Sequence, residues 1–176
     1  MRLKGGPTQD EVMAVSLAKL GIRPGDRVAD VGCGTGKVSI AASRVAEHVY
    51  AIDRRPEAVA YARREAAAAG SENIEFFEGD AVDVLAGIDH LDAAFVGGSR
   101  RLPEVLDLLA RKVRGRIVVN AVMVGTLYEA ITSMQRLGIF IEALHLQVSR
   151  SAAIADGVMF KPQNPVYVIV GGVGCS

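Results

Sequence analysis

The chain has 176 residues, of which 50% are hydrophobic and 23% are charged. This length predicts a single domain spanning residues 1–176, and the apolar fraction is large enough for one sizeable core, which excludes a disordered chain. The 20 basic and 20 acidic residues cancel to a formal net charge of zero. Proteins that hold nucleic acid by bulk electrostatics usually carry a basic excess, so this balance disfavours such a partner without excluding a local basic patch.

Targeting and metal signals are absent from the sequence. No stretch approaches the roughly 18 uncharged apolar residues that a membrane span needs, and the N-terminus lacks the apolar run of a signal peptide. We therefore expect a cytoplasmic protein. The two cysteines, Cys33 and Cys175, form no CxxC pair, and no histidines or cysteines show metal-ligand spacing, so we expect no protein-bound metal.

Helical and strand-like patterns alternate along most of the chain. Thr8 and Glu11 have the spacing of a capping box, which predicts a helix that starts there and ends at Gly21. A turn at Pro24-Gly25-Asp26 precedes the first strand. The patterns then predict strands over 27–31, 48–53, 73–77, 91–96 and 116–122, and helices ending near 45 and over 56–70, 82–86, 102–111 and 126–137.

This alternation favours a parallel sheet with helices on both faces. The C-terminal part differs, because residues 139–148 and 166–170 are both strand-like with no helix between them. We expect a terminal antiparallel strand pair joined by a long loop that contains Asp156-Gly157 and Pro162. The predicted fold class is a three-layer α/β/α, Rossmann-like fold with a seven-stranded, mostly parallel sheet.

A glycine-rich loop follows the first predicted strand. It reads Asp30-Val-Gly32-Cys33-Gly34-Thr35-Gly36, the pattern D-x-G-x-G-x-G. Glycines permit a positive φ and allow a ligand to approach the backbone closely. A ligand at this loop would lie outside the carboxyl end of a strand, the usual site in open α/β sheets.

Three cofactors compete for this loop. The dinucleotide fingerprint G-x-G-x-x-G fails, because its third glycine would fall on Lys37 or Ser39. The P-loop pattern fails as well, because Val31 and Val38 stand where it needs glycine and Ser or Thr. The remaining candidate is S-adenosylmethionine.

Two further acidic residues follow the next two strands. Asp53 could accept hydrogen bonds from both ribose hydroxyls, a feature that would also suit NAD. Asp80 could accept from the adenine amino group, while the N–H of Ala81 could donate to a ring nitrogen. The alternative is structural: the glycines only make a tight turn and the acids only cap helices. Taken together, the loop and both acids resemble class I S-adenosylmethionine-dependent methyltransferases.

A narrower resemblance covers nearly the whole chain. Its motifs, in order, are Gly6-Pro7-Thr8-Gln9, the loop 30–36, Tyr50-Ala-Ile-Asp53, Glu78-Gly-Asp-Ala81, Phe95-Val-Gly-Gly-Ser99, Gly115-Arg-Ile-Val-Val-Asn120-Ala and Asn164-Pro-Val166. They resemble the corrin-pathway C15-methyltransferases (decarboxylating) of the CbiT type. The resemblance implies methylation of cobalt-precorrin-6B at C15, loss of the C12 acetate carboxyl as CO₂, and a homotetramer. It also implies cofactor contacts at Thr8, Gly32, Cys33, Gly34, Thr35, Gly36, Asp53 and Ala81.

A polycarboxylate substrate needs local cationic donors, because the net charge is zero. The candidate substrate residues are Gly98, Ser99, Arg100, Arg101, Asn120 and Arg150. The structural alternative is that the arginines are solvated surface charges and that Asn120 caps the start of the loop after its strand. Arg100 and Arg101 depart from the family, which usually has small glycine-rich residues after Gly-Gly-Ser. The sequence nominates no general base.

Two other functions stay open. One is a class I methyltransferase that acts on tRNA or protein. Amino-nitrogen methyltransferases often carry Asn/Asp-Pro-Pro-Tyr/Phe after the fourth strand, where this chain has Val96-Gly97-Gly98-Ser99. The other is a protein that binds S-adenosylmethionine without turnover, which the sequence does not exclude.

Overall fold

A mostly parallel seven-stranded sheet organises the chain, in the order β3-β2-β1-β4-β5-β9-β6. The computed structural model describes residues 8–98 and 100–172. The sheet contains β1 (Arg27–Val31), β2 (His48–Asp53), β3 (Ile74–Glu78), β4 (Ala93–Val96), β5 (Arg116–Ala121), β6 (Phe140–Leu146) and β9 (Val166–Gly172). The helices are α1 (Asp10–Leu20), α2 (Lys37–Ser43), α3 (Pro56–Ala68), α4 (Ala81–Ala86), α5 (Leu102–Lys112) and α6 (Val124–Arg136).

The predicted fold class is confirmed, with small shifts at the ends of elements. The two strands predicted over 27–31 and 48–53 coincide with β1 and β2. The strand predicted over 91–96 is shorter, because Leu91 makes only an isolated bridge to Val113 before β4 begins at Ala93. None of the helices within residues 8–98 and 100–172 is both long and apolar enough to cross a membrane.

The predicted capping box at the start of α1 is wrong. Gln9, not Thr8, is the N-cap residue, and no side chain caps this helix end. The backbone N–H of Met13 donates to the Gln9 carbonyl, which places the first turn one residue later than the Thr-x-x-Glu spacing predicts. The predicted C-terminal stop is confirmed, since Gly21 adopts the left-handed conformation at φ 62°.

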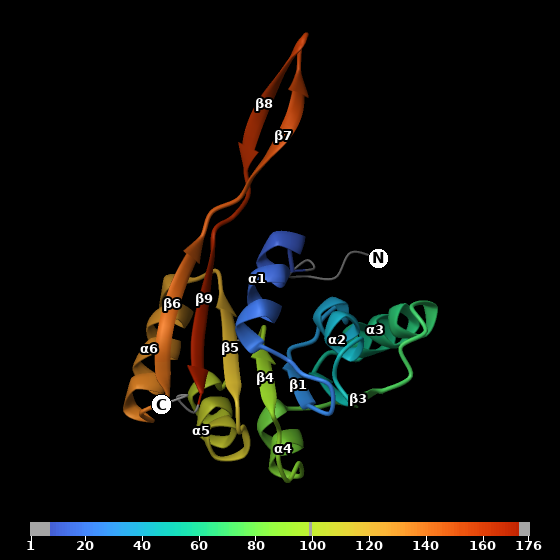
Figure 1. Cartoon of the computed structure of the whole chain (residues 1–176), viewed down its shortest axis with the longest axis vertical. Coiled ribbons are helices and arrows are strands. Elements are labelled where there is room, and N and C mark those ends of the chain that lie inside the picture. Colours follow the sequence, from blue (N-terminus) through green and yellow to red (C-terminus); the bar gives the residue numbers. More distant parts are fainter. Residues whose placement is uncertain (1–7, 99, 173–176) are drawn as a thin grey trace.

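The terminal antiparallel pair is confirmed, but the long loop between its strands is wrong. Strand β9 lies between β5 and β6 and is antiparallel to both. The connecting segment forms a second, two-stranded sheet from β7 (Ser149–Ile154) and β8 (Gly157–Pro162). Asp156-Gly157 lies at its turn, a dipeptide typical of hairpins. Figure 1 shows this hairpin projecting well beyond the rest of the molecule.

The sheet is covered on both faces, as its continuous apolar strands require. Helices α4, α5 and α6 pack on one face over side chains such as Val31, Ile52 and Val119. Helices α1 and α2 pack on the other face over Val28, Val49 and Val168. This arrangement leaves the carboxyl ends of β1, β2, β4 and β5 at one edge of the parallel strands, where ligands bind in open α/β sheets.

Asn73 fixes the connection that leads into β2. Its amide Nδ2 donates to the carbonyls of Ser43 and Ala46 at 2.9 Å and of Glu47 at 3.3 Å. These three carbonyls lie at the end of α2 and in the turn after it, so one side chain satisfies groups that the helix leaves unpaired. The N–H of Val49 also donates to the Asn73 carbonyl.

Replacing Asn73 tests this connection. We expect Asn73→Ala to lower the free energy of unfolding by about 1–3 kcal/mol, because the carbonyls lose their donor. Asn73→Asp should cost more than Asn73→Ala, since it places carboxylate oxygens against carbonyl oxygens. Urea titrations of both variants measure the difference. Equal stability of the two variants would contradict a donor role for this amide.

Candidate functional site

The loops after β1 and β4 meet at closer range than side chains allow. Gly32 has φ +78°, and a Cβ atom built on it would lie 2.7 Å from the backbone nitrogen of Gly98. The N–H groups of Gly97 and Gly98 donate to the Val31 carbonyl at 2.8 and 3.2 Å. Only glycine satisfies both the positive φ and this approach, so the glycine pattern has a structural cause at Gly32.

Gly36, the last glycine of the loop, has a packing role. It adopts φ +76° before α2, and a Cβ atom there would lie 2.9 Å from the Cβ of Ala62 in α3. Gly36 is buried. Packing therefore explains the identity of Gly36 without a ligand, as it does for Gly32, but Gly36 lines neither of the two cavities described next.

Two cavities lie beside the contact between these loops, and both are lined by Gly32, Gly97 and Arg55. The smaller cavity, of about 280 Å³, brings together residues that follow β2, β3 and β4; its other lining residues are Val31, Ile52, Asp53, Arg54, Gly79, Asp80, Ala81, Gly98 and Arg100. The larger cavity, of about 400 Å³, extends toward α1 and β9; its other lining residues are Thr8, Gln9, Val12, Asp30, Cys33, Gly34, Thr35, Lys37, Val38, Phe95, Asn120, Val122, Asn164 and Val166.

Asp53 lies at the end of β2 and is 5% exposed. One carboxylate oxygen accepts from the backbone N–H of Gly34, and the other from the backbone N–H of Arg55, both at 3.0 Å. The Arg55 guanidinium adds two further hydrogen bonds of 3.0 Å, one to each oxygen. Burial raises the pKa of Asp53, but these hydrogen bonds outweigh it and hold the pKa below its usual value.

The position of Asp80 suits both of the roles considered for it, that of a helix cap and that of an acceptor for the adenine amino group. As the N-cap of α4 it accepts from the backbone N–H of Val82 at 3.0 Å, and it also lines the smaller cavity beside Ala81. Arg101 donates to the same oxygen, Oδ1, at 3.0 Å, while Oδ2 has a looser ion pair with Arg100 at 4.0 Å. One carboxylate oxygen of Asp80 therefore keeps room for a further donor.

Three buried polar atoms that line the larger cavity lack a hydrogen-bond partner within the described part of the chain. They are two acceptors, Gln9 Oε1 and Asp30 Oδ1, and one donor, Asn120 Nδ2. The other amide atom of Asn120, Oδ1, lies 3.0 Å from the hydroxyl of Ser16 in α1, which is fully buried. Buried polar groups in folded proteins are almost always paired, so unpaired atoms on a cavity wall point to a polar ligand.

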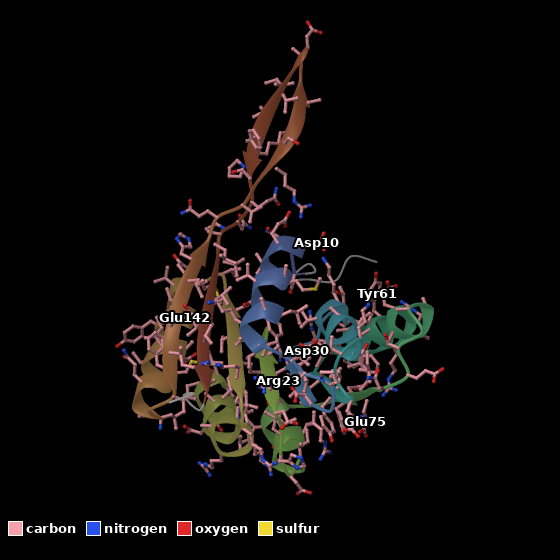
Figure 2. The ribbon with its side chains drawn as sticks, in the orientation of Figure 1. Asp10, Arg23, Asp30, Tyr61, Glu75 and Glu142 are labelled. Carbon is pink, nitrogen blue, oxygen red and sulfur yellow. The ribbon has the colours of Figure 1, made fainter. Side chains whose placement is uncertain are left out.

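Asp30 lines the larger cavity and has a strongly perturbed pKa. It is 1% exposed, and burial raises its pKa to about 6 although the Ser39 hydroxyl donates to it. Figure 2 labels Asp30 inside the body of the molecule. Cys33, from the same loop, is a buried free thiol whose pKa burial also raises, so it is a poor nucleophile at neutral pH.

The cationic residues expected to hold substrate are scattered. Arg100 is exposed at the smaller cavity, and Arg101 is held by Glu104 and Asp80. Arg150, at the base of the hairpin, forms a 2.8 Å ion pair with Glu11 of α1. Ser99 lies outside the described residues. Of the other candidate substrate residues, Gly98 lines the smaller cavity and Asn120 the larger one. Thr8 and Thr35, predicted to contact the cofactor, also line the larger cavity.

Sequence reasoning did not nominate several residues that line the site. Asp30 opens the glycine motif, and the motif itself could have marked it as a buried acid. Arg55 and Lys37 gave no signal, because a lone basic residue beside a turn or helix start is usually solvated. Gln9 and Asn164 belong to the motifs of the family resemblance, but nothing in their spacing indicated that they meet across one cavity.

The sheet order, with β9 antiparallel between β5 and β6 and a glycine loop after β1, defines a class I methyltransferase fold. Residues 3–171 match the family model described as a precorrin methyltransferase domain. The chain belongs to this family of precorrin methyltransferases.

Individual relatives agree with this membership. The chain is 49% identical to a probable cobalt-precorrin-6B C(15)-methyltransferase (decarboxylating) of Methanosarcina acetivorans, over 96% of this chain and 95% of the relative. A crystal structure of a precorrin 8W decarboxylase from Methanobacterium thermoautotrophicum superposes with a TM-score of 0.92 at 36% identity, covering 96% of this chain and 92% of that one. A precorrin-6Y C5,15-methyltransferase from Geobacter metallireducens also has a TM-score of 0.92, at 30% identity, covering 98% and 94%.

The raised pKa of Asp30 predicts a pH-dependent stability. The folded carboxyl binds its proton up to about pH 6, whereas the usual value for this side chain is 3.8, so the folded state loses stability as the pH rises from about 4 to 7. Asp30→Asn should remove this loss and make the ligand-free protein more stable than the wild type at pH 8 by about 1–3 kcal/mol.

Urea unfolding at pH 4.5 and pH 8 measures both effects. Asp89→Asn is the matched control, because Asp89 is an exposed acid and its replacement should leave the pH profile unchanged. An Asp30→Asn protein whose stability varies with pH as the wild type does would contradict the burial argument.

Proposed function

We propose that this chain methylates C15 of cobalt-precorrin-6B and removes the carboxyl group of the C12 acetate as CO₂, with S-adenosylmethionine as the methyl donor, in cobalamin biosynthesis. The observation that carries the proposal is the match to the precorrin methyltransferase family over residues 3–171, at 49% identity to the relative from Methanosarcina acetivorans. The two cavities at the glycine loop support it independently, because their polar groups suit the cofactor of that reaction.

The donor and acceptor chemistry of the two cavities divides as the two halves of S-adenosylmethionine do. The smaller cavity offers two carboxylates, Asp53 and Asp80, for ribose hydroxyls and an adenine amino group, with the Ala81 backbone beside them. In the larger cavity the unpaired acceptors Gln9 Oε1 and Asp30 Oδ1 suit an ammonium group, and the unpaired donor Asn120 Nδ2 suits a carboxylate. A methionine moiety carries both of these groups.

When bound, S-adenosylmethionine supplies a methyl group already activated on a sulfonium. The chain's own residues then have to bind the cofactor and the tetrapyrrole, orient them toward each other and exclude water. Most of the rate acceleration of such a reaction comes from this positioning. The conjugated tetrapyrrole can absorb the electron pair that decarboxylation leaves, so no further electron sink is needed. Consistent with this, the thiol of Cys33 is held protonated by burial, and we nominate no general base.

For the tetrapyrrole we propose contacts at the open rims of both cavities. Gly98 and Arg100 line the smaller cavity, and Arg100 is exposed there. Asn120 lines the larger cavity and could instead donate to a ring acetate rather than to the cofactor carboxylate. Arg101 and Arg150 are less suited, since each already has an acidic partner within 3.0 Å.

Incubation with S-adenosylmethionine and cobalt-precorrin-6B tests the proposed reaction directly. Mass spectrometry of the tetrapyrrole should show the gain of one methyl group and the loss of one CO₂, with one S-adenosylhomocysteine released for each turnover. Consumption of S-adenosylmethionine with tRNA, and none with the tetrapyrrole, would overturn the proposal. Binding of the cofactor without any turnover would favour the non-catalytic alternative.

We also propose that the chain forms a homo-oligomer, a tetramer by family resemblance, through the hairpin β7–β8 and the surface near it. The hairpin exposes large apolar side chains in the single chain: Ile154 is 53% exposed, Val158 71% and Phe160 69%. An isolated two-stranded hairpin is marginally stable in water, and an exposed apolar cluster of this kind usually marks an interface. A second copy of the chain is the occupant that the family resemblance supports.

Polar replacements on the hairpin test the assembly. A Val158→Ser/Phe160→Ser protein should dissociate into smaller species, because each buried apolar side chain contributes about 1.5–3 kcal/mol to an interface. Light scattering after size exclusion measures the mass in multiples of 18.6 kDa. Val45→Ser is the control, since Val45 is 45% exposed and lies after α2, far from the hairpin in sequence. A monomeric wild type would contradict the assembly.

A further inference from the structure

The carboxylate of Asp53 has no room for a ribose in the structure described here. Its two oxygens already accept four hydrogen bonds, two from backbone N–H groups and two from the guanidinium of Arg55. A carboxylate offers about four acceptor positions, so all of them are filled. Asp80 differs, because its Oδ2 has only the 4.0 Å ion pair with Arg100. The ribose hydroxyls therefore have to compete with protein donors at Asp53, whereas the adenine amino group meets no such competition at Asp80.

The two groups of bonds to Asp53 are not equivalent. The backbone donors are the N–H of Gly34 in the glycine loop and the N–H of Arg55 in the turn after β2. Both can stay in place when the side chain of Arg55 moves. The guanidinium places Nε on one carboxylate oxygen and Nη2 on the other, both at 3.0 Å. This two-pronged donor pattern is the one that a vicinal diol also presents to a carboxylate, one hydroxyl to each oxygen.

Arg55 also stands between the two cavities. It lines both of them, and its Nη2 would lie 3.8 Å from a Cβ atom built on Gly34, so the guanidinium lies against the glycine loop. Its side chain is 32% exposed, so it has water on one side to move toward. A guanidinium displaced from Asp53 stays beside the larger cavity, where a polycarboxylate substrate would offer it several carboxylates.

We propose that Arg55 is a substrate-binding residue that the cofactor shifts: the ribose replaces the guanidinium on Asp53, and the displaced guanidinium binds a carboxylate of the tetrapyrrole. The substrate half of this inference rests on the proposed function, whereas the exchange at Asp53 does not. Because binding free energies are linked, the cofactor and the tetrapyrrole then strengthen each other's binding by the same factor, and removal of Arg55 abolishes that factor.

The exchange is tested with S-adenosylhomocysteine alone, by calorimetry. Arg55→Ala removes the competitor, so S-adenosylhomocysteine should bind about two- to fivefold more tightly, the range expected for a partly exposed ion pair. Arg55→Lys keeps the charge but loses the two-pronged contact and should give a smaller gain. Arg136→Ala is the matched control, since Arg136 forms a 2.7 Å ion pair with Asp107 between α6 and α5. Weaker binding by Arg55→Ala would overturn the exchange, because it would make Arg55 a cofactor ligand where it stands.

A double-mutant cycle gives a second readout that a merely structural role would not move. In the wild type, Asp53→Ala removes the ribose acceptor, which weakens nucleoside binding. It also removes the ion pair that the ribose must displace, which strengthens binding, so the two effects partly cancel. In the Arg55→Ala background the same replacement should weaken S-adenosylhomocysteine binding more, by about the factor that Arg55→Ala gained. An identical effect of Asp53→Ala in both backgrounds would contradict the exchange. Circular dichroism and thermal melting of each variant establish that it is folded.

The substrate half is tested by titrating cobalt-precorrin-6B with and without saturating S-adenosylhomocysteine. The wild type should bind the tetrapyrrole more tightly with the nucleoside present, and Arg55→Ala should show no such difference. Equal coupling in both proteins would overturn the role of Arg55 toward substrate. If the wild type fails to bind the tetrapyrrole at all, the proposed substrate is wrong, while tighter nucleoside binding by Arg55→Ala would still support the exchange.

Discussion

The site depends on one steric constraint, the contact of backbone with backbone where the loops after β1 and β4 meet. A side chain at position 32 would lie 2.7 Å from the nitrogen of Gly98, so the two loops can approach only because Gly32 has none. Gly32 and Gly97 line both cavities. Without this approach the two cavities would not adjoin, and a ligand with a nucleoside half and an amino-acid half could not be held across the junction.

Two carboxylates near this junction show how the same chemical group is tuned in opposite directions. Asp30 accepts a hydrogen bond from the Ser39 hydroxyl of α2 with one oxygen, its other oxygen is unpaired, and it is 1% exposed, so burial raises its pKa to about 6. Asp53 is also largely buried, but it accepts from Gly34 and from Arg55, and its pKa is lowered. The difference lies in the donors around each group and not in depth alone. Asp30 therefore binds its proton at a higher pH than is usual for this side chain, while Asp53 holds its charge and already has its hydrogen-bond acceptors filled.

The hairpin β7–β8 carries exposed apolar side chains away from the packed sheet. It joins β6 to β9 and projects beyond the rest of the molecule, as Figure 1 shows. Asn164 and Val166, which follow the hairpin, line the larger cavity. The apolar side chains of the hairpin are exposed, and the ion pair of Arg150 with Glu11 connects its base to α1. Gln9, the N-cap residue of α1, lines the larger cavity, so the same helix contacts both the base of the hairpin and the site.

The sequence by itself determined the elements and their order. The apolar runs of β1 and β2, Pro56 at the start of α3 and Gly21 at the end of α1 act over a few residues, so local rules locate them. It also determined the glycine loop and the family motifs, because their spacing is local too. It missed the hairpin, although Asp156-Gly157 marks the turn, since the flanking strands are short and exposed and lack the alternation of a half-buried strand.

Only the tertiary structure decided which side chains meet. It set Ser16 of α1 on Asn120 of β5 and Arg101 on Asp80, pairs that are 104 and 21 positions apart. The physical reason is that a hydrogen bond depends on where two elements are placed by the packing of the whole sheet. Spacing along the chain carries that information for a loop or a helix turn, but not for residues that the fold brings together from different strands.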